Sequence, residues 1–419
     1  MIWKHELRLF LRERAAIPAL LLLLALATAS VVAGLAETAR QRAVIARIQP
    51  VQAADVAALA DGDNPGDAPY STYHATWNAP NPLAFAALGQ RDIAPYILRV
   101  RALGLEAQLY DGETFNPELA LPGRFDFAFV LTYLLPMFVI VLLHDLRARE
   151  DEAGRSAALQ AMSRNAGLLW FRRRAVRGLL LYAMILPPFL VGALVSRVPP
   201  GQIVAVSLLA LLYLMFWLAL ATLVERLGWK SAANAGALVA GWLILTLILP
   251  TLANLAINSA VPVRQGLELA LAHRQKVHAA WEIPRAETLN AFYRTNPRWS
   301  GASPPKGFDD KWYFAFHEVA DESVAPAARA YQQGLLDRDR LTQRLGWFIP
   351  AIGLQARLHR MAETDLSAQL AYQDRIREFH SRLRQFYYGY LFSDRPFTRT
   401  DYPKAPKWGD GMGGLPPSR

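Results

Sequence analysis

The sequence predicts an α-helical membrane protein with about five spans and two large insertions outside the membrane. Hydrophobic residues make up 53% of its 419 positions, more than an ordinary soluble domain carries. They gather in five apolar runs, each about as long as a bilayer-spanning helix and free of Asp, Glu, Lys, Arg and His. The runs are residues 15–36, 127–143, 179–196, 203–224 and 232–257.

Residues 1–14 precede the first run and predict an amphipathic helix lying along the inner surface of the membrane. Its apolar side consists of Trp3, Leu7, Phe10 and Leu11, and its polar residues include Glu6, Arg8 and Arg12. The first run has a longer apolar core than a typical signal peptide, and Ala27-Thr-Ala29 is a weak cleavage motif. We therefore interpret the run as a retained anchor.

The loop after the second run, residues 144–178, indicates the topology. It carries eight arginines, and the positive-inside rule places such a short basic loop in the cytoplasm. These are Arg147, Arg149, Arg155, Arg164, Arg172, Arg173, Arg174 and Arg177. The amino terminus is then inside, whereas residues 37–126 and 258–419 are expected in the periplasm, outside a bacterial inner membrane. The net charge of +10 thus reflects topology rather than a nucleic-acid partner.

The first outside region, residues 37–126, is expected to begin as a helical continuation of the first run through Arg47. A loop of turn-forming residues follows at 61–69. The chain has no cysteine, so disulfides cannot stabilise this short region. Its aromatic residues are therefore expected to pack against the second outside region to form one body. These residues are Tyr70, Tyr73 and Trp77.

The second outside region, residues 258–419, is predicted to contain a long helix near its end. Six apolar residues recur there at spacings of three and four: Tyr372, Ile376, Phe379, Leu383, Phe386 and Tyr390. Such a stripe needs a partner, either the rest of its own region or a helix of a second subunit. Beyond it, a stretch rich in Pro and Gly predicts an irregular tail.

A motif follows the second run. This run contains Pro136 and passes into His144-Asp145-Leu146 and then into an acidic stretch that ends at Gly154. The arrangement resembles the second span and following loop of ABC-2-type transporter permeases, in which an acidic segment ending Glu-x-Gly touches the partner ATPase. Glu152 and Gly154 match that ending, whereas Arg155 stands where a small hydroxyl residue is usual. The resemblance implies an ATPase-coupling site at Arg149, Glu150, Glu152, Gly154 and Arg155.

The resemblance covers nearly the whole chain and implies a type V exporter-like bundle. Residues 1–14 resemble the elbow helix of ABC-2 permeases, and the two insertions resemble the branch related to multicopper-enzyme-maturation permease components. That branch usually closes with a sixth span. Residues 345–354 are too short for one and contain Pro350. The chain is then either truncated or a five-span variant.

Prolines inside the runs predict kinks, because each removes a backbone donor. They are Pro136, Pro187, Pro188 and Pro250. Such kinks are either hinges for alternating access or ordinary features of membrane helices. In the fifth run, Ala233, Ala237 and Gly241 form a small-residue face that predicts close packing on a helix of the same or another chain.

Motifs for catalysis do not occur in the sequence. It has neither the Gly-x-x-x-x-Gly-Lys loop that cradles nucleotide phosphates nor a Gly-x-Ser-x-Gly elbow. His273 and His278 are five residues apart, and His317 adjoins Glu318, which is no metal-binding pattern. We therefore expect no catalytic, cofactor or metal site in this chain, and no enzyme activity of its own.

The functional hypothesis is the permease subunit of an ABC exporter. Its partners would be a cytoplasmic ATPase dimer that binds ATP and Mg²⁺, a second permease subunit in a homodimer or heterodimer, and membrane lipid. The spans lack ionisable residues of the kind that ion-driven carriers use, so energy is expected from outside the chain. The alternative is a mechanotransmission or scaffold protein that acts on periplasmic partners without transport. A membrane-embedded enzyme is a third interpretation. The sequence does not identify a transported substrate.

Overall fold

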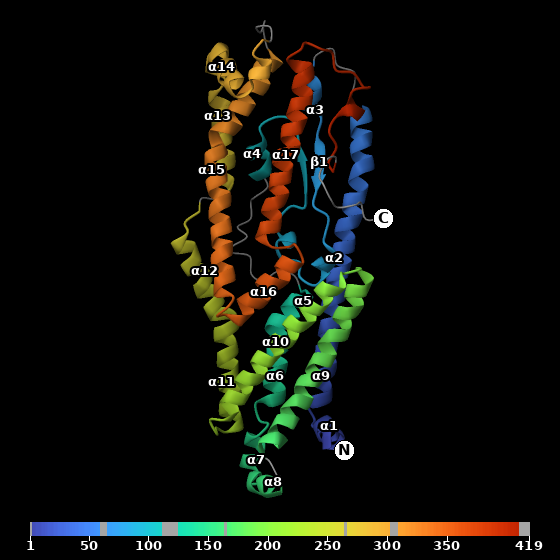
Figure 1. Cartoon of the computed structure of the whole chain (residues 1–419), viewed down its shortest axis with the longest axis vertical. Helices are drawn as coiled ribbons and strands as arrows, with labels where there is room; N and C mark the ends of the chain where they lie inside the picture. The colour runs from blue at the N-terminus through green and yellow to red at the C-terminus, as the bar shows by residue number, and fades with distance from the viewer. Residues whose placement is uncertain are drawn as a thin grey trace.

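The computed structural model describes residues 2–58, 65–110, 125–162, 166–263, 266–301 and 309–409. Figure 1 shows an elongated molecule with a helix bundle below and a second part above, which we call the head. The head comprises the described residues of 65–110 and 266–409, with the upper part of the first long helix beside them. The predictions for Arg164 and for the end of the tail fall outside the described residues.

The bundle confirms the helical membrane class. Five of the described helical segments are long and apolar enough to cross a membrane. The first, third and fourth spans are single helices: α2 (Ala16–Ala58), α9 (Ala166–Val195) and α10 (Pro200–Glu225). The second span consists of α5 (Phe127–Phe129), η3 (Val130–Leu134) and α6 (Leu135–Leu143). The fifth span consists of α11 (Ser231–Leu243), η4 (Ile244–Ile248) and α12 (Leu249–Ala260). The second span lies at the centre, with 67% of its apolar window buried, whereas only 11% of the fifth is buried.

Helix α2 extends far beyond the first apolar run. It continues through Arg47, as predicted, and past Pro50 to Ala58. Its 43 residues correspond to about 65 Å at 1.5 Å per residue. One helix therefore runs from the lower end of the bundle up the side of the head (Figure 1).

Helix α9 begins at Ala166, not at residue 179 as the apolar run suggested. Four of the loop arginines, Arg172, Arg173, Arg174 and Arg177, are therefore on its first turns. Arg174 pairs with Glu225 at 3.0 Å, and Arg177 pairs with Glu13 at 2.5 Å. Because these guanidinium groups have carboxylate partners, the helix can continue through charged residues below its apolar stretch.

Residues 2–11 form the predicted amino-terminal helix, α1 (Ile2–Leu11), which lies at the lower end of the bundle (Figure 1). Its faces differ from the prediction in one respect. Trp3 and Leu11 are exposed, but Phe10 is buried in the bundle core. The Arg177 guanidinium lies over the Phe10 ring, 4.8 Å from the ring centroid. Arg8 and Arg12 are exposed, whereas Glu6 is buried.

The head is mostly helical and contains a small sheet. Strands β1 (His74–Trp77) and β2 (Ile97–Val100) pair antiparallel, with His74 opposite Val100. The short elements around them are α3 (Asp67–Ser71), η1 (Pro82–Phe85), η2 (Gly89–Asp92) and α4 (Leu105–Tyr110). The second region supplies α13 (Gly266–Ala279), α14 (Arg285–Thr295), η5 (Pro297–Trp299), α15 (Asp310–Leu345), α16 (Pro350–Met361), α17 (Leu366–Leu391) and η6 (Tyr402–Lys404).

Helix α17 carries the predicted apolar stripe and packs it within its own chain. Tyr372, Ile376, Phe379 and Leu383 are fully buried in the head core. The stripe also joins the two regions that were predicted to lie outside the membrane, because the Tyr387 hydroxyl lies 2.9 Å from His74 Nε2 and that of Tyr372 lies 2.9 Å from Thr76 Oγ1. Arg377 adds two bonds to the Glu106 carboxylate. The prediction that the two regions form one body is confirmed.

The predicted aromatic residues reach this interface in part. The ring of Tyr70 lies 5.9 Å from that of Tyr313 in the second region, measured between centroids, but Tyr70 and Tyr73 stay about half exposed and Arg101 lies over both rings. Trp77 does face the second region, where its carbonyl accepts a bond from Trp408 Nε1 at 2.9 Å. The alternating pleat of β1 sends His74 and Thr76 inward instead.

Helix α16 rests on the bundle. Its Leu354 and Leu358 belong to the same buried cluster as the spans, and Gln355 Nε2 donates to the Tyr133 hydroxyl at 3.3 Å. Pro350 is its first residue, where a missing N–H costs nothing. Residues 345–354, which are too short for a sixth span, thus lead into a helix that covers the head-side end of the bundle.

Candidate functional site

The lower tip of the molecule consists of two short helices, α7 (Ala148–Glu152) and α8 (Ser156–Met162), as Figure 1 shows. Gly154 joins them with φ of +68°, a conformation that residues with a side chain rarely adopt. The Arg155 N–H donates to the Glu150 carbonyl at 2.9 Å, and the Gly154 N–H donates to the Asp151 carbonyl at 3.0 Å. This is a Schellman ending, so Gly154 sets the angle between the two helices.

The Glu150 carboxylate connects this loop to two other elements. It accepts a bond from Arg155 Nε at 2.8 Å and lies 3.4 Å from a guanidinium nitrogen of Arg173 in α9. Arg173 Nε in turn lies 3.4 Å from the buried Glu6 carboxylate in α1. The loop, the third span and the elbow helix therefore share one line of alternating charges.

Glu152 connects the same loop to the fifth span. Its carboxylate accepts the Ser231 N–H at 2.8 Å, the first amide of α11. The first amides of a helix have no partner within the helix and carry partial positive charge, so a carboxylate there is stabilising. Arg149 stays near its own element, where it pairs with Asp145 at 2.5 Å.

The structure thus gathers the five predicted coupling residues in one loop and adds partners that the sequence analysis missed. Those partners, Glu6, Arg173 and Ser231, are distant in the sequence, and no local spacing points to them. Of the elbow residues, Glu6 joins the network, whereas Arg8 and Arg12 are exposed on α1.

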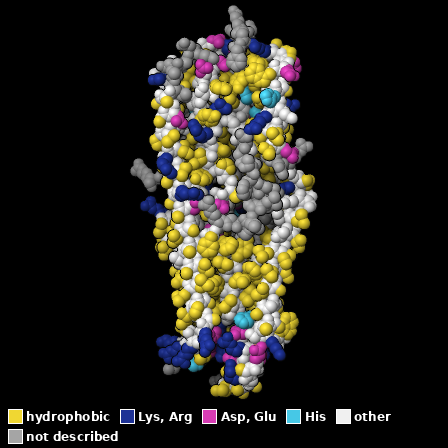
Figure 2. Space-filling view, turned by 180° about the vertical axis from the view of Figure 1, so that it is seen from behind, with side chains coloured by type: hydrophobic (Ala, Val, Ile, Leu, Met, Phe, Trp, Pro, Cys, Tyr) yellow, Lys and Arg dark blue, Asp and Glu magenta, His cyan; other side chains and the backbone are white. Residues whose placement is uncertain are grey.

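Helix α8 presents an apolar surface at the very end of the molecule. Met162 is 87% exposed, the highest value among the large hydrophobic residues described. Ala157, Ala158 and Ala161 are exposed beside it. Figure 2 shows hydrophobic side chains at this lower end, beneath a band of Lys and Arg. This surface was not predicted, because short alanine-rich segments give no motif.

Two of the predicted hinges follow π-helical turns. Pro136 comes after η3 and Pro250 comes after η4, and both of these segments are π-helical. In a regular α-helix the N–H of residue 136 would donate to the Thr132 carbonyl, which here accepts the Tyr213 hydroxyl at 2.9 Å instead. Such turns are frequent at functional sites.

The two π-helical spans are also joined directly. Trp242, in α11 of the fifth span, donates its indole N–H to the Tyr133 carbonyl at 3.1 Å. Pro187 and Pro188 differ from the other prolines, since α9 remains one helix through both. The next residue, Phe189, stacks on Phe127 with ring centroids 5.2 Å apart. Among the described spans that carry a predicted hinge proline, the second and the fifth therefore have a π-helical turn before it, and the third does not.

A second polar cluster lies inside the head around Asp321. Its carboxylate is 2.6 Å from an Arg384 guanidinium nitrogen and 3.0 Å from His273 Nε2, and it accepts the Leu105 N–H at 2.8 Å. Burial alone would raise the pKa of Asp321, but Arg384 and His273 hold that pKa below its usual range. The cluster joins α4, α13, α15 and α17.

Two histidines beside this cluster, His317 and His380, favour the neutral form. Burial, together with Arg384, lowers the pKa of His317 to about 3 and that of His380 to about 3. His278 is exposed. Among the described residues, no group of three or more His, Cys, Asp or Glu is placed to hold a metal ion. The charge pair of Asp321 and Arg384 lies within the second region, and it binds backbone groups of the first region, the Leu105 N–H and the Leu103 carbonyl.

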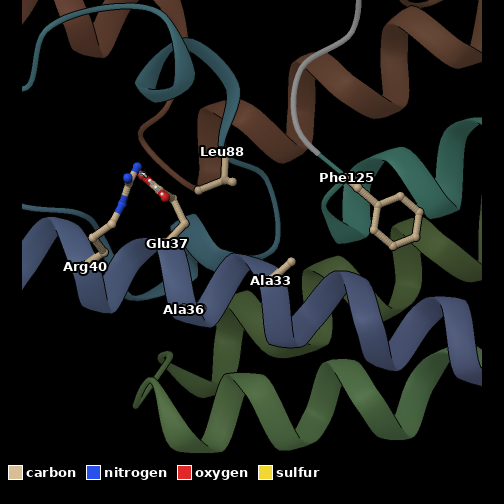
Figure 3. A pocket seen from close by; sticks show the side chains of 6 residues that line it. All are labelled: Ala33, Ala36, Glu37, Arg40, Leu88 and Phe125. Atoms are coloured by element: carbon tan, nitrogen blue, oxygen red, sulfur yellow. Dashed lines mark hydrogen bonds and ion pairs between the residues drawn. The ribbon is translucent and has the colours of Figure 1, made fainter.

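A groove of about 380 Å³ lies where α2 leaves the bundle, shown in Figure 3. It is lined by Ala33, Ala36, Glu37, Arg40, Leu88 and Phe125. Arg40 pairs with Glu37 at 2.7 Å, and Glu37 also accepts a bond from Gln41. Gln41 in turn accepts from the buried Arg91 at 2.9 Å, which ties α2 to the head.

Comparison with known proteins concerns the head alone. Residues 267–409 match the model of a family described as a domain of unknown function, DUF3526, which covers about a third of the chain. The match begins in α13 and ends after η6. No curated protein and no solved structure matches this chain.

Proposed function

We propose that this chain is the membrane subunit of an ABC-2-type exporter and that a separate cytoplasmic ATPase dimer drives two such subunits. The observation that carries the proposal is the lower tip, where α8 ends in an exposed apolar surface. The predicted topology places this tip in the cytoplasm. Exposed apolar surface on a projecting helix suits a protein partner that covers it.

The bonds of the tip support a coupling role. A force on α7 would reach α1 and α9 through Glu150 and Arg173, and would reach α11 through Glu152. Helix α7 directly follows α6 of the second span, and the π-helical turn of that span lies at the other end of α6, toward the head. Closure of the ATPase could therefore tilt three spans together. ATP and Mg²⁺ would bind the partner, and this chain would bind neither.

Photocrosslinking tests the proposal. A benzophenone amino acid at Met162 should capture a protein that carries a Gly-x-x-x-x-Gly-Lys phosphate loop, whereas the same group at the exposed Glu287 of α14 should not. Met162→Arg should abolish ATP hydrolysis by the purified complex. Leu227→Arg, in the exposed turn before α11, is the matched control and should leave hydrolysis unchanged. Capture of no nucleotide-binding protein at position 162 would contradict the proposal.

Mechanotransmission is the second candidate, because two rigid connections enter the head. Helix α2 is unbroken from the bundle to Ala58, and α16 is bonded to the second span through Gln355 and Tyr133. Motion of the spans would then move the head without any molecule crossing the membrane.

Water access along the fifth span separates the two candidates. Single cysteines at Ala233, Ala237 and Gly241 would be treated with a water-soluble maleimide, with and without ATP. An exporter predicts labelling in at least one nucleotide state, because a polar path must open between subunits. A transmitter predicts protection in every state.

A further inference from the structure

The turn between α15 and α16 exposes two adjacent aromatic side chains. Trp347 is 77% exposed and Phe348 is 83% exposed, and among the large hydrophobic residues described only Met162 exceeds them. Isolated apolar residues on a surface are ordinary, but two neighbouring aromatic rings almost entirely outside the protein are costly in water.

A close contact between two glycines holds this turn in place. A Cβ on Gly353 would lie 2.1 Å from the Gly346 carbonyl oxygen, and a Cβ on Gly346 would lie 2.9 Å from the Gly353 Cα. The ends of α15 and α16 therefore touch through their backbones, and the flanking Ile349 is buried. The geometry is built to present Trp347 and Phe348 outward.

The turn lies beside the head-side part of the fifth span. Helix α15 runs antiparallel to α12, since Gly334 abuts Val263 and Arg338 Nε donates to the Val261 carbonyl at 2.9 Å. From Arg338 to Leu345 the helix continues for about 10 Å toward the bundle. The aromatic pair is therefore level with the apolar surface of α12, where Leu255 is exposed.

Basic side chains surround the aromatic pair. The Arg357 guanidinium lies 4.4 Å from the centroid of the Trp347 ring. The exposed arginines of these two helices within about twelve residues of the turn are Arg340, Arg344, Arg357 and Arg360. Arg340 pairs with Asp337 at 2.7 Å, and Arg360 lies 3.9 Å from Asp339. Aromatic rings combined with arginines are typical of the boundary between lipid and water.

We propose that the turn of residues 346–349 inserts into the head-side leaflet of the membrane. Trp347 and Phe348 lie among the first carbons of the acyl chains, and Arg344 and Arg357 bind phospholipid phosphates. The occupant is lipid, because the turn continues the apolar surface of the fifth span and its exposed charges are mainly positive. The head is thereby anchored to the bilayer at a point outside the five spans.

Spin labels in proteoliposomes test this insertion. The chain has no cysteine, so Phe348→Cys introduces one labelling site at a side chain that supports no core. Leu255→Cys provides a lipid-facing reference, and Glu287→Cys, exposed on α14, provides an aqueous one. The label at position 348 should collide with oxygen more than with a water-soluble nickel chelate, as at position 255. Collisions like those at position 287 would overturn the proposal, and collisions with neither reagent would show that a second copy covers the turn.

The arginines have a separate test. An environment-sensitive fluorophore at Phe348→Cys should shift its emission to shorter wavelength in vesicles that contain phosphatidylglycerol, compared with phosphatidylcholine alone. Arg344→Gln with Arg357→Gln should remove that shift. Lys276→Gln with Arg294→Gln, which removes two exposed charges from α13 and α14, should retain it. An emission that is independent of vesicle charge in the unmodified background would overturn the assignment of phosphate binding.

Discussion

At the scale of single residues, Gly154 links backbone geometry to the proposed coupling role. No atom lies within 4 Å of the Cβ that alanine would add, so only its positive φ opposes substitution. Gly154→Ala should cost about 1 kcal/mol in this conformation and displace α8 relative to α7. We expect normal membrane insertion and weaker stimulation of ATP hydrolysis in the purified complex.

The control for this substitution is Gly201→Ala. Gly201 also has open space around its Cβ, but it lies in the first turn of α10 without a positive φ. Its replacement should leave ATP hydrolysis unchanged. If both variants behave alike, the angle at Gly154 does not matter for coupling.

Buried histidines make the stability of the head depend on pH. Burial lowers the pKa of His74 to about 4, and it is the main cause that lowers the pKa of His317 and of His380 to about 3. An unfolded histidine takes up its proton near pH 6.5, so between these values the unfolded chain binds more protons. Stability is therefore fully present above about pH 6.5 and falls as the pH drops toward 4. Thermal unfolding followed by near-ultraviolet circular dichroism should show this decline.

His317→Phe tests the origin of the pH dependence. The ring of His317 lies 4.8 Å from that of Tyr313 and 4.9 Å from that of Phe316, measured between centroids, so phenylalanine suits the site. The variant should lose less stability on acidification than the unmodified chain. His278→Gln, at an exposed position, should not alter the pH dependence. An unchanged slope in the His317 variant would contradict the assignment.

At the scale of elements, the π-helical turns depend on side chains from other spans. Tyr213→Phe removes the hydroxyl that donates to the Thr132 carbonyl. We expect it to reduce the stability of the bundle by about 1 kcal/mol, because that carbonyl loses its donor beside Pro136. Unfolding in mixed detergent micelles would measure the loss.

Tyr182→Phe is the matched control for Tyr213→Phe. Its hydroxyl donates to the Ser207 carbonyl at 3.0 Å, within the regular helix α10. That carbonyl is not followed by a proline four residues later, so the substitution should cost less. Equal losses in the two variants would mean that the π-helical turn does not need the Tyr213 bond.

Element boundaries show how far local pattern can predict. Hydropathy located all five spanning helices, because length and apolarity decide which segments can enter a bilayer. It placed the start of α9 too late, because Arg174 and Arg177 raise the polarity of a helix whose charges are paired in space. The prolines marked Pro136 and Pro250 as irregular positions, but they did not predict the π-helical turns before them. In the second span that turn involves Tyr213 and Trp242 of other spans.

At the scale of the whole molecule, the tip and the head should lie on opposite sides of the membrane. The molecule places α8 at one end and α14 at the other, with the five apolar helices between them (Figure 1). A membrane-impermeant maleimide applied to intact cells should label Glu287→Cys and leave Met162→Cys unlabelled until the cells are opened. The reverse pattern would show that the positive-inside assignment is wrong.

Composition and spacing were enough to predict a helical protein, five segments that can span a membrane, and the loop that collects the arginines. These properties follow from composition and spacing along the chain, and each segment carries its own signal. The stripe on α17 likewise required a partner, although the sequence left open whether that partner was another subunit.

Tertiary structure alone decided which residues meet. Three arrangements join residues far apart in the sequence. They are the line of charges from Glu150 through Arg173 to Glu6, the Asp321 cluster, and the contact of α16 with the second span. Contacts of this kind depend on how helices pack and on which charges must be paired once buried, and no local pattern encodes them. The exposure of Trp347 and Phe348 could not be predicted from the sequence for the same reason, because it depends on the contact between Gly346 and Gly353 that shapes their turn.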